Sequence, residues 1–413
     1  MDVAQENLPS PSAVAAARTI RLIGLTLLLG YLVVLGGTYL KGDFLIDRQG
    51  RPIANDFVNV VAAGQLARDG MPASAYDWPL HKQAEYRAVG HDFGEYYGWP
   101  YPPTFLFVAA ALSTLPYLVA ALTWLAVTLA AYAASICNIV GREFGWRTGL
   151  FVALGFPAGL WNVTAGQNGF FTAALIGGTL GLMERRPALA GICLGLLTYK
   201  PQFGLLFPLV LIADRRWRTM AVAAVVASGL AALSWLAFGS ASWEAFVHAM
   251  PVTARVVLGE GHAGFGRLQS LFGLVRAHGG SEPLAWAVQI SGSLAVAAWT
   301  IWLWRSSAPF DLKAAALAAG ALIVTPYLFM YDLAALAVAV AFLIRFALER
   351  GFAATEIIGL SAAGALILIF PYVETQVGLA AVLIVLALVA RRTFTQARLT
   401  SPAQSLKLGG GPA

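Results

Sequence analysis

The sequence contains few charged residues for its length. Only 12% of its 413 residues are Asp, Glu, Lys or Arg, whereas 59% are apolar. A soluble globular domain carries about 25% charged residues, because its surface must be solvated by water. The composition therefore excludes an ordinary soluble domain. Apolar runs that recur along most of the chain predict an integral membrane protein with many crossings.

Cysteines, metal-ligand clusters and long basic blocks are scarce as well. The two cysteines, Cys137 and Cys193, lie inside apolar runs, which excludes a disulfide framework. No group of His, Cys, Asp and Glu has metal-ligand spacing, so we place no metal ligand and predict no cofactor. The net charge of +6 comes without a basic block longer than residues 215–218. We therefore expect no nucleic-acid partner.

The hydropathy pattern predicts an all-α polytopic helical bundle with about twelve transmembrane helices. Residues 18–398 would form one transmembrane domain. Residues 1–17 and 399–413 have no apolar periodicity and contain turn-forming residues, which predicts disordered ends. The predicted spans cover residues 20–39, 118–140, 148–163, 169–183, 187–199, 202–213, 219–238, 284–304, 310–326, 331–346, 353–370 and 375–390.

Basic residues mark one side of this predicted bundle. The arginines of the short connections all lie on that side, and the positive-inside rule makes it cytoplasmic. Both termini would then be cytoplasmic, in an inner (plasma) membrane protein. The long segments 41–117 and 239–283 would lie outside. In the first of them, Thr104–Ser113 is expected to form an interfacial helix after Pro102 and Pro103.

Two polar turns are predicted to lie below the outer surface. The spans on either side of Lys200 have about 12 to 13 residues, which is roughly 20 Å of helix and too short for a 30 Å hydrocarbon core. The turn at Gly166–Gly169 also joins short spans. Irregular backbone at such depth is tolerated only against protein or a water-filled cavity. The pattern therefore predicts a polar cavity that opens to the outside.

Five short motifs occur in order along the chain: Asp56-Phe57, Tyr101-Pro102-Pro103, Gly166-Gln167-Asn168, Lys200-Pro201-Gln202 and Tyr331-Asp332. In order, spacing and predicted sidedness they resemble the polyprenyl-phosphate-mannose-dependent glycosyltransferases of family 87, which belong to the GT-C superfold. The resemblance covers about residues 20 to 350. It implies a lipid-phosphate sugar donor, an inverting hexosyltransferase with mannose as the expected sugar, and an acidic base in the first outer loop.

Two residues suit the chemistry that this resemblance implies. Sugar transfer needs a carboxylate that accepts the acceptor's proton and a cation that stabilises the departing phosphate. Asp56 is the candidate general base, although it could instead cap the helix that follows, as could Asn55. Lys200 is the candidate phosphate contact. Its alternative is a lysine that extends to the membrane edge without binding a ligand.

The other candidate substrate-binding residues also have structural alternatives. Gln167 and Asn168 could bind sugar or phosphate, or satisfy a broken helix end. Asp332 could be a helix cap. Tyr101 is retained from an aromatic cluster, residues 96–101, that otherwise suits a membrane-interface belt. The remaining candidates are Gln202, two positions after Lys200, and the pair His262 and Arg267. His262 lies in the glycine-rich run 259–266, which is expected to form a mobile flap, and Arg267 directly follows that run.

The leading functional hypothesis is a membrane glycosyltransferase whose partners are a lipid-linked sugar donor, a glycan or glycolipid acceptor and the bilayer. The alternative is a non-enzymatic flippase or transporter for a lipid-linked sugar, which would need polar lining along its whole path. A third hypothesis, an inactive assembly partner, leaves recessed Lys200 and Asp332 without a purpose. The predicted spans have few ionisable residues in their inner halves, which favours the transferase.

Overall fold

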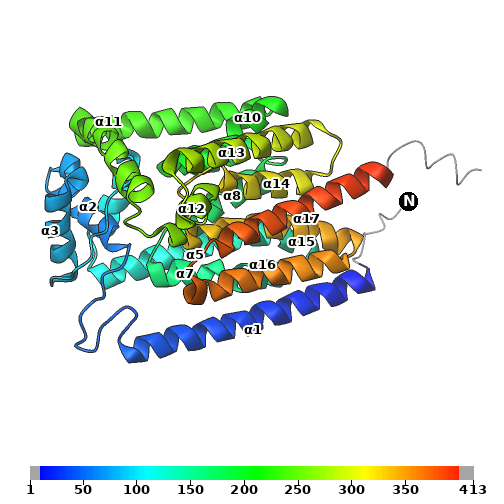
Figure 1. Cartoon of the computed structure of the whole chain (residues 1–413), viewed down its shortest axis with the longest axis horizontal. Coiled ribbons are helices and arrows are strands. Elements are labelled where there is room, and N and C mark those ends of the chain that lie inside the picture. The colour runs from blue at the N-terminus through cyan, green and yellow to red at the C-terminus, as the bar shows by residue number, and fades with distance from the viewer. Residues whose placement is uncertain (1–9, 400–413) are drawn as a thin grey trace, which may run out of the picture.

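The computed structural model describes residues 10–399, and in this range the chain is helical (Figure 1). Between these residues there is no β-strand, apart from two isolated bridges within residues 44–52. The predicted all-α class is thus confirmed. The predicted disordered ends lie largely outside the described residues.

The first helix, α1 (Pro11–Lys41), begins at Pro11 rather than near residue 18. Ser10 caps it by accepting a hydrogen bond from the Ala13 N–H at 3.2 Å. Proline is well suited to the first helical position, because its missing N–H would be unpaired there in any case. The short alanine-rich segment that follows therefore extends the helix toward the N-terminus.

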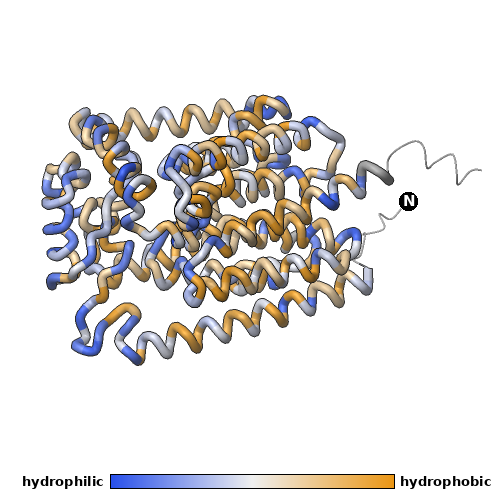
Figure 2. The backbone as a smooth tube through the Cα atoms, viewed as in Figure 1, coloured by the Kyte–Doolittle hydropathy of each residue, from blue (hydrophilic) through white to orange (hydrophobic). Residues whose placement is uncertain are grey.

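Within residues 10–399, seven helices are long and apolar enough to cross a membrane. The chain is therefore a multi-pass membrane protein. Figure 2 shows apolar residues along the length of the bundle and hydrophilic residues toward its two ends. The seven are α1, α5 (Tyr117–Phe144), α11 (Trp217–Ala254), α13 (Glu282–Arg305), η7 with α15 (Met330–Ala335 and Leu336–Arg350), α16 (Ala354–Val373) and α17 (Val377–Leu399).

The predicted count of twelve spans is not confirmed, because the remaining predicted spans are short or bent. Helices α6 (Trp146–Leu154) and α7 (Ala158–Ala165) meet at 59° and could form an eighth span together. Each of the others has at most 14 residues, or about 21 Å of helix. They are α8 (Gly169–Leu182), α9 with η3 (Pro187–Leu196 and Leu197–Tyr199), η4 with α10 (Pro201–Gly204 and Leu206–Ala213) and α14 (Phe310–Ile323).

The two ends of the bundle differ in character. We call the end that carries residues 42–116 the loop end; α1 begins and α17 finishes at the opposite, terminal end (Figure 1). Helix α15 lies at the centre, with 83% of its apolar stretch buried, whereas only 11% of that of α1 is buried. At the terminal end, Asp311 is paired with Arg345 and Glu356 with Arg392.

The first long loop folds as short helices, as predicted. Its helix α2 packs closely on α4, since a Cβ at Gly64 would lie 2.0 Å from the Ala109 carbonyl oxygen. Trp99 does not belong to an interfacial belt: it is 4% exposed and stacks on Phe105. The elements are α2 (Val58–Arg68), η1 (Pro72–Tyr76), α3 (Trp78–Val89), η2 (Pro103–Phe105) and α4 (Leu106–Leu112).

The second long loop continues helix α11 beyond a sharp bend. Gly239, at φ 77°, has a left-handed backbone conformation that turns the helix across the loop end. The chain then forms a π-helical turn, η5 (Arg255–Gly259), a 3-10 turn, η6 (Phe265–Arg267), and α12 (Leu271–Ala277). Such π-helical turns are rare and often occur at functional sites.

Candidate active site

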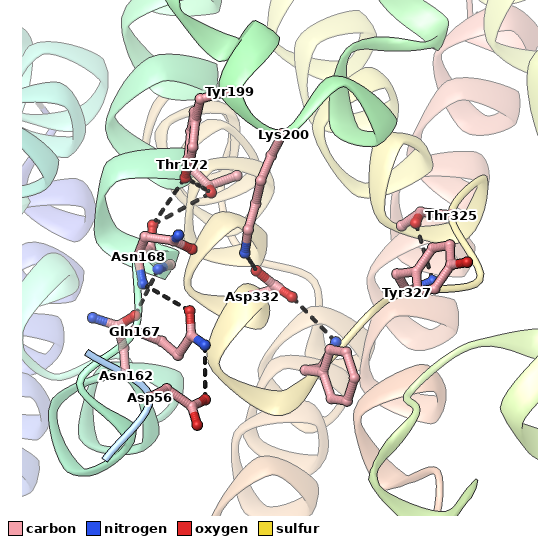
Figure 3. Close-up of polar contacts among 12 residues, drawn as sticks. Asp56, Asn162, Gln167, Asn168, Thr172, Tyr199, Lys200, Thr325, Tyr327 and Asp332 are labelled. Carbon is pink, nitrogen blue, oxygen red and sulfur yellow. Dashed lines mark hydrogen bonds and ion pairs between the residues drawn. The ribbon is translucent and has the colours of Figure 1, made fainter. Parts of the chain in front are cut away.

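Asp56 lies just before α2 and faces the recessed turn between α7 and α8 (Figure 3). The Gln167 Nε2 donates a hydrogen bond to the Asp56 Oδ2 at 2.7 Å. The side chain that accepts a hydrogen bond at the start of α2 is Asn55, not Asp56: the Asn55 Oδ1 accepts a hydrogen bond from the Phe57 N–H at 3.1 Å. The carboxyl group of Asp56 is therefore not used as a helix cap.

Gln167 and Asn168 lie in a buried turn, as the short flanking helices predicted. Gln167 is 8% exposed and Asn168 is 3% exposed. The turn begins at Gly166, whose backbone has a left-handed conformation with φ 66°. Because glycine has no side chain, Asn55 can pack against it: a Cβ at position 166 would lie 2.5 Å from the Asn55 Oδ1. Glycine at this position thus brings the turn against the segment that carries Asp56.

Tyr101 completes this hydrogen-bonded set. Its hydroxyl accepts from the Asn168 Nδ2 at 2.8 Å and donates to the Gln167 Oε1 at 3.4 Å. The Asn168 Oδ1 is buried and has no hydrogen-bond partner among the described residues. Asp56 is the one member of the set that is partly exposed.

Lys200 and Asp332 form a second, buried set. The Lys200 Nζ donates to the Asp332 Oδ1 at 2.8 Å, and the side chains are 8% and 1% exposed. The other oxygen, Asp332 Oδ2, accepts from the Phe329 N–H at 3.3 Å at the start of η7. Asp332 is thus both a helix cap and the counter-ion of Lys200. Lys200 is not an unpaired lysine at the membrane edge.

Tyr199 links the two sets. Its hydroxyl donates to the Asn168 carbonyl oxygen at 3.2 Å and lies 2.6 Å from the Thr172 Oγ1. Sequence reasoning missed Tyr199 and Thr172 as members of the site, although Tyr199 directly precedes Lys200 in the sequence. It also gave Asn162 no role, yet the Asn162 Oδ1 accepts from the Gly169 N–H at 2.6 Å and holds the start of α8.

The remaining candidates lie at the margin of the site. Gln202 is half-buried in η4 and makes no hydrogen bond within residues 10–399. His262 has a side chain that is 67% exposed, and its Nδ1 lies 3.2 Å from a Glu260 oxygen. Arg267 is exposed, and its positive charge acts on the Asp56 carboxyl group. Of these three residues, Arg267 is the one with an electrostatic connection to the site.

The environment of Asp56 makes its carboxyl group a better base than a free aspartate. Burial raises the pKa of Asp56 to about 6, although the hydrogen bond from Gln167 and the charges of Lys200 and Arg267 oppose this rise. The charge of Glu95 raises the pKa further. A general base is most effective when its pKa lies near the working pH. The arrangement can therefore accept a proton near neutral pH.

No group of three or more His, Cys, Asp or Glu side chains in residues 10–399 is arranged to hold a metal ion. The site offers instead one partly exposed carboxylate, amide groups, a buried ion pair and a nearby arginine. This set can accept a proton from a hydroxyl group and offer N–H donors to an anion.

Comparison with known proteins supplies the family. The model of "Glycosyltransferase family 87" matches residues 99–326, a range that includes Tyr101, Gln167, Asn168 and Lys200 and stops short of Asp332. Asp56 also lies outside the matched range. No curated protein and no solved structure matches the chain. Because the family model covers more than half of the sequence, the chain belongs to glycosyltransferase family 87 and is a membrane glycosyltransferase.

Proposed function

We propose that this glycosyltransferase moves a hexose, with mannose as the first candidate, from a polyprenyl phosphate to a glycan or glycolipid acceptor on the extracytoplasmic side. The observation that carries the proposal is Asp56, a partly exposed residue whose carboxyl group has no capping role and is held by Gln167. The polyprenyl-phosphate donor and mannose rest on the family resemblance of the motifs, and the GT-C fold is part of the same proposal.

In the proposed reaction, an acceptor hydroxyl group attacks the anomeric carbon of the donor sugar. Asp56 accepts the hydroxyl proton as the new C–O bond forms. The bond between the anomeric carbon and the phosphate oxygen breaks with its electron pair, and polyprenyl phosphate departs. The transition state has oxocarbenium character, as in glycosidases. Attack opposite to the leaving group inverts the anomeric configuration.

The departing phosphate needs positive charge or N–H donors. Lys200 is neutralised by Asp332, so it would contribute its remaining N–H donors rather than a full unpaired charge. Arg267 has an exposed guanidinium close enough to influence Asp56. We therefore assign the phosphate to Lys200 and Arg267 together. The unpartnered Asn168 Oδ1 and the Gln167 side chain would contact the sugar.

The distribution of buried charge favours transfer over passage across the membrane. A flippase would need polar groups available along its path, yet the buried acidic groups at the terminal end are occupied by arginines. The partly exposed carboxylate is at the loop end.

A donor panel tests the proposal. Purified protein would be incubated with a lipid extract of the host and with radiolabelled polyprenyl-phosphate-mannose, polyprenyl-phosphate-glucose or GDP-mannose. We expect a new labelled product from a polyprenyl-phosphate sugar, with mannose preferred and an inverted linkage. A product from GDP-mannose alone would contradict the proposed donor class.

A further inference from the structure

A groove lies at the loop end, between the η1–α3 segment and the part of α11 that follows Gly239. It is an open depression of about 480 Å³, which is within the range of roughly 300 to 1,000 Å³ typical of small-molecule sites. Figure 1 shows these segments side by side at the loop end. Tyr76 from one segment packs against Phe246 from the other, with their ring centroids 5.9 Å apart. We call it the η1–α11 groove; its lining residues are Ala73, Ser74, Tyr76, Asp77, Trp78, Ala245, His248, Ala249 and Val252.

The lining combines an aromatic surface with short polar groups. Trp78 is 39% exposed, and Asp77, Ser74 and His248 supply a carboxylate, a hydroxyl and an imidazole. Asp77 uses its Oδ1 to accept from the Leu80 N–H at the start of α3. On the α11 side, small alanines at 245 and 249 share a helix face with His248 and leave space above it.

This chemistry suits a saccharide better than an acyl chain or an anion. The C–H face of a pyranose packs against the electron-rich face of an indole, and its hydroxyl groups pair with carboxylate, hydroxyl and imidazole groups. An acyl chain would cover the exposed polar groups of Asp77 and His248 without forming hydrogen bonds to them. A phosphate would be repelled by the carboxylate of Asp77.

The groove adjoins the candidate active site through one pair of tyrosines. The Tyr76 hydroxyl donates to the Tyr101 carbonyl oxygen at 2.8 Å. The Tyr101 hydroxyl contacts Gln167 and Asn168, and Gln167 holds Asp56. The groove and the site around Asp56 therefore share a hydrogen-bonded wall at the loop end.

We propose that the η1–α11 groove binds the saccharide part of the acceptor, namely the sugar units beyond the one that carries the attacking hydroxyl group. This inference rests on the proposed function. It gives the outer part of α11 and the η1–α3 segment a role in choosing the acceptor, whereas the site around Asp56 and Lys200 handles the donor.

A blocking experiment tests the groove without knowledge of the acceptor. Ala249→Cys would be made in a chain in which Cys137 and Cys193 are replaced by serine, and modified with a bulky methanethiosulfonate reagent. The matched control is Val247→Cys, on the same helix, 51% exposed and not among the lining residues. We expect modification at 249, but not at 247, to lower transfer to the lipid-extract acceptor by about tenfold or more, with binding of labelled polyprenyl-phosphate-mannose unchanged. Equal transfer by the two modified proteins would overturn the inference.

A protection assay keeps the inference separate from the proposed function, because it requires no transfer. Mannotriose should slow modification of Ala249→Cys and leave that of Val247→Cys unchanged. Adding Trp78→Ala should abolish protection, whereas adding Leu80→Ala, which is equally exposed on the same helix but outside the lining, should preserve it. Absence of protection, or protection that survives Trp78→Ala, would contradict a saccharide site. Protection without any transfer by the unmodified protein would count against the proposed function alone.

Discussion

Asp56 is the residue on which the proposed chemistry depends. Asp56→Asn keeps the side chain's size and an oxygen that can still accept from Gln167, but its amide cannot accept the acceptor's proton. We expect transfer to fall by about 10²- to 10⁴-fold, with donor binding retained. Labelled-donor turnover and equilibrium binding of the donor measure the two quantities.

Two neighbouring residues serve as controls for this substitution. Glu95 is an exposed carboxylate whose charge acts on Asp56, and Asn55 provides the hydrogen bond to the start of α2. Glu95→Gln should transfer nearly normally, and Asn55→Ala should mainly cost about 1 kcal/mol of stability. If Glu95→Gln loses transfer while Asp56→Asn keeps it, Glu95 is the base.

The pH dependence of transfer follows from the raised pKa of Asp56, which is about 6. A general base works in its deprotonated form, so activity should be lost as the pH falls through about 6 and should level off above it. A free aspartate would give the same loss near pH 3.9. The rate at saturating donor, measured from pH 4.5 to 8, checks this. A profile that is flat between pH 5 and 7 would show that Asp56 does not control the rate.

At the scale of elements, the Lys200–Asp332 pair joins the start of η4 to η7. Lys200→Met would leave a buried carboxylate without its counter-ion, which typically costs about 3 to 5 kcal/mol. We therefore expect a clear fall in unfolding temperature, in addition to weaker donor use.

The double variant Lys200→Met with Asp332→Asn separates the two effects. It removes both charges, so its stability should recover much of the loss seen in the single variant. Its affinity for the donor should stay low if Lys200 contacts the phosphate. A double variant that is as unstable as Lys200→Met would show that the ion pair is not what stabilises this contact.

The recessed turns could be predicted from sequence because element length alone sets their depth. Short apolar runs beside Gln167 and Lys200 required burial, and both residues are buried. The partners of these residues could not be predicted, since Asp56 and Gln167 are 111 positions apart and Lys200 and Asp332 are 132 apart. Only the packing of distant helices decides such contacts. The same holds for Asn162, whose role depends on the bend between α7 and α8.

At the scale of the whole molecule, hydropathy identified where helices form but not how many of them cross the membrane. Each predicted span coincides with a helix or a helix pair, yet α8, α9, α10 and α14 are too short to cross alone. Helices α8 and α14 are buried inside the bundle and do not need the length of a lipid-facing helix, whereas α9 and α10 are only partly buried. The long connections at the loop end were predicted from the hydropathy pattern, but the helical continuation of α11 beyond Gly239 was not.

The proposed topology places the loop end outside the cell and the terminal end in the cytoplasm. Gln49 is exposed at the loop end, and Arg185 is exposed in the turn between α8 and α9. We expect Gln49→Cys to react with a membrane-impermeant thiol reagent in intact cells, and Arg185→Cys to react only after permeabilisation. The reverse pattern would place the site around Asp56 on the cytoplasmic side.

The measurement that tests the central claim most directly uses proteoliposomes that contain the purified protein, a host lipid extract and radiolabelled polyprenyl-phosphate-mannose. The account predicts a new labelled product with wild-type protein and almost none with Asp56→Asn. A donor that reaches the opposite leaflet with its sugar still attached, and with no new product, would identify a flippase and contradict the account.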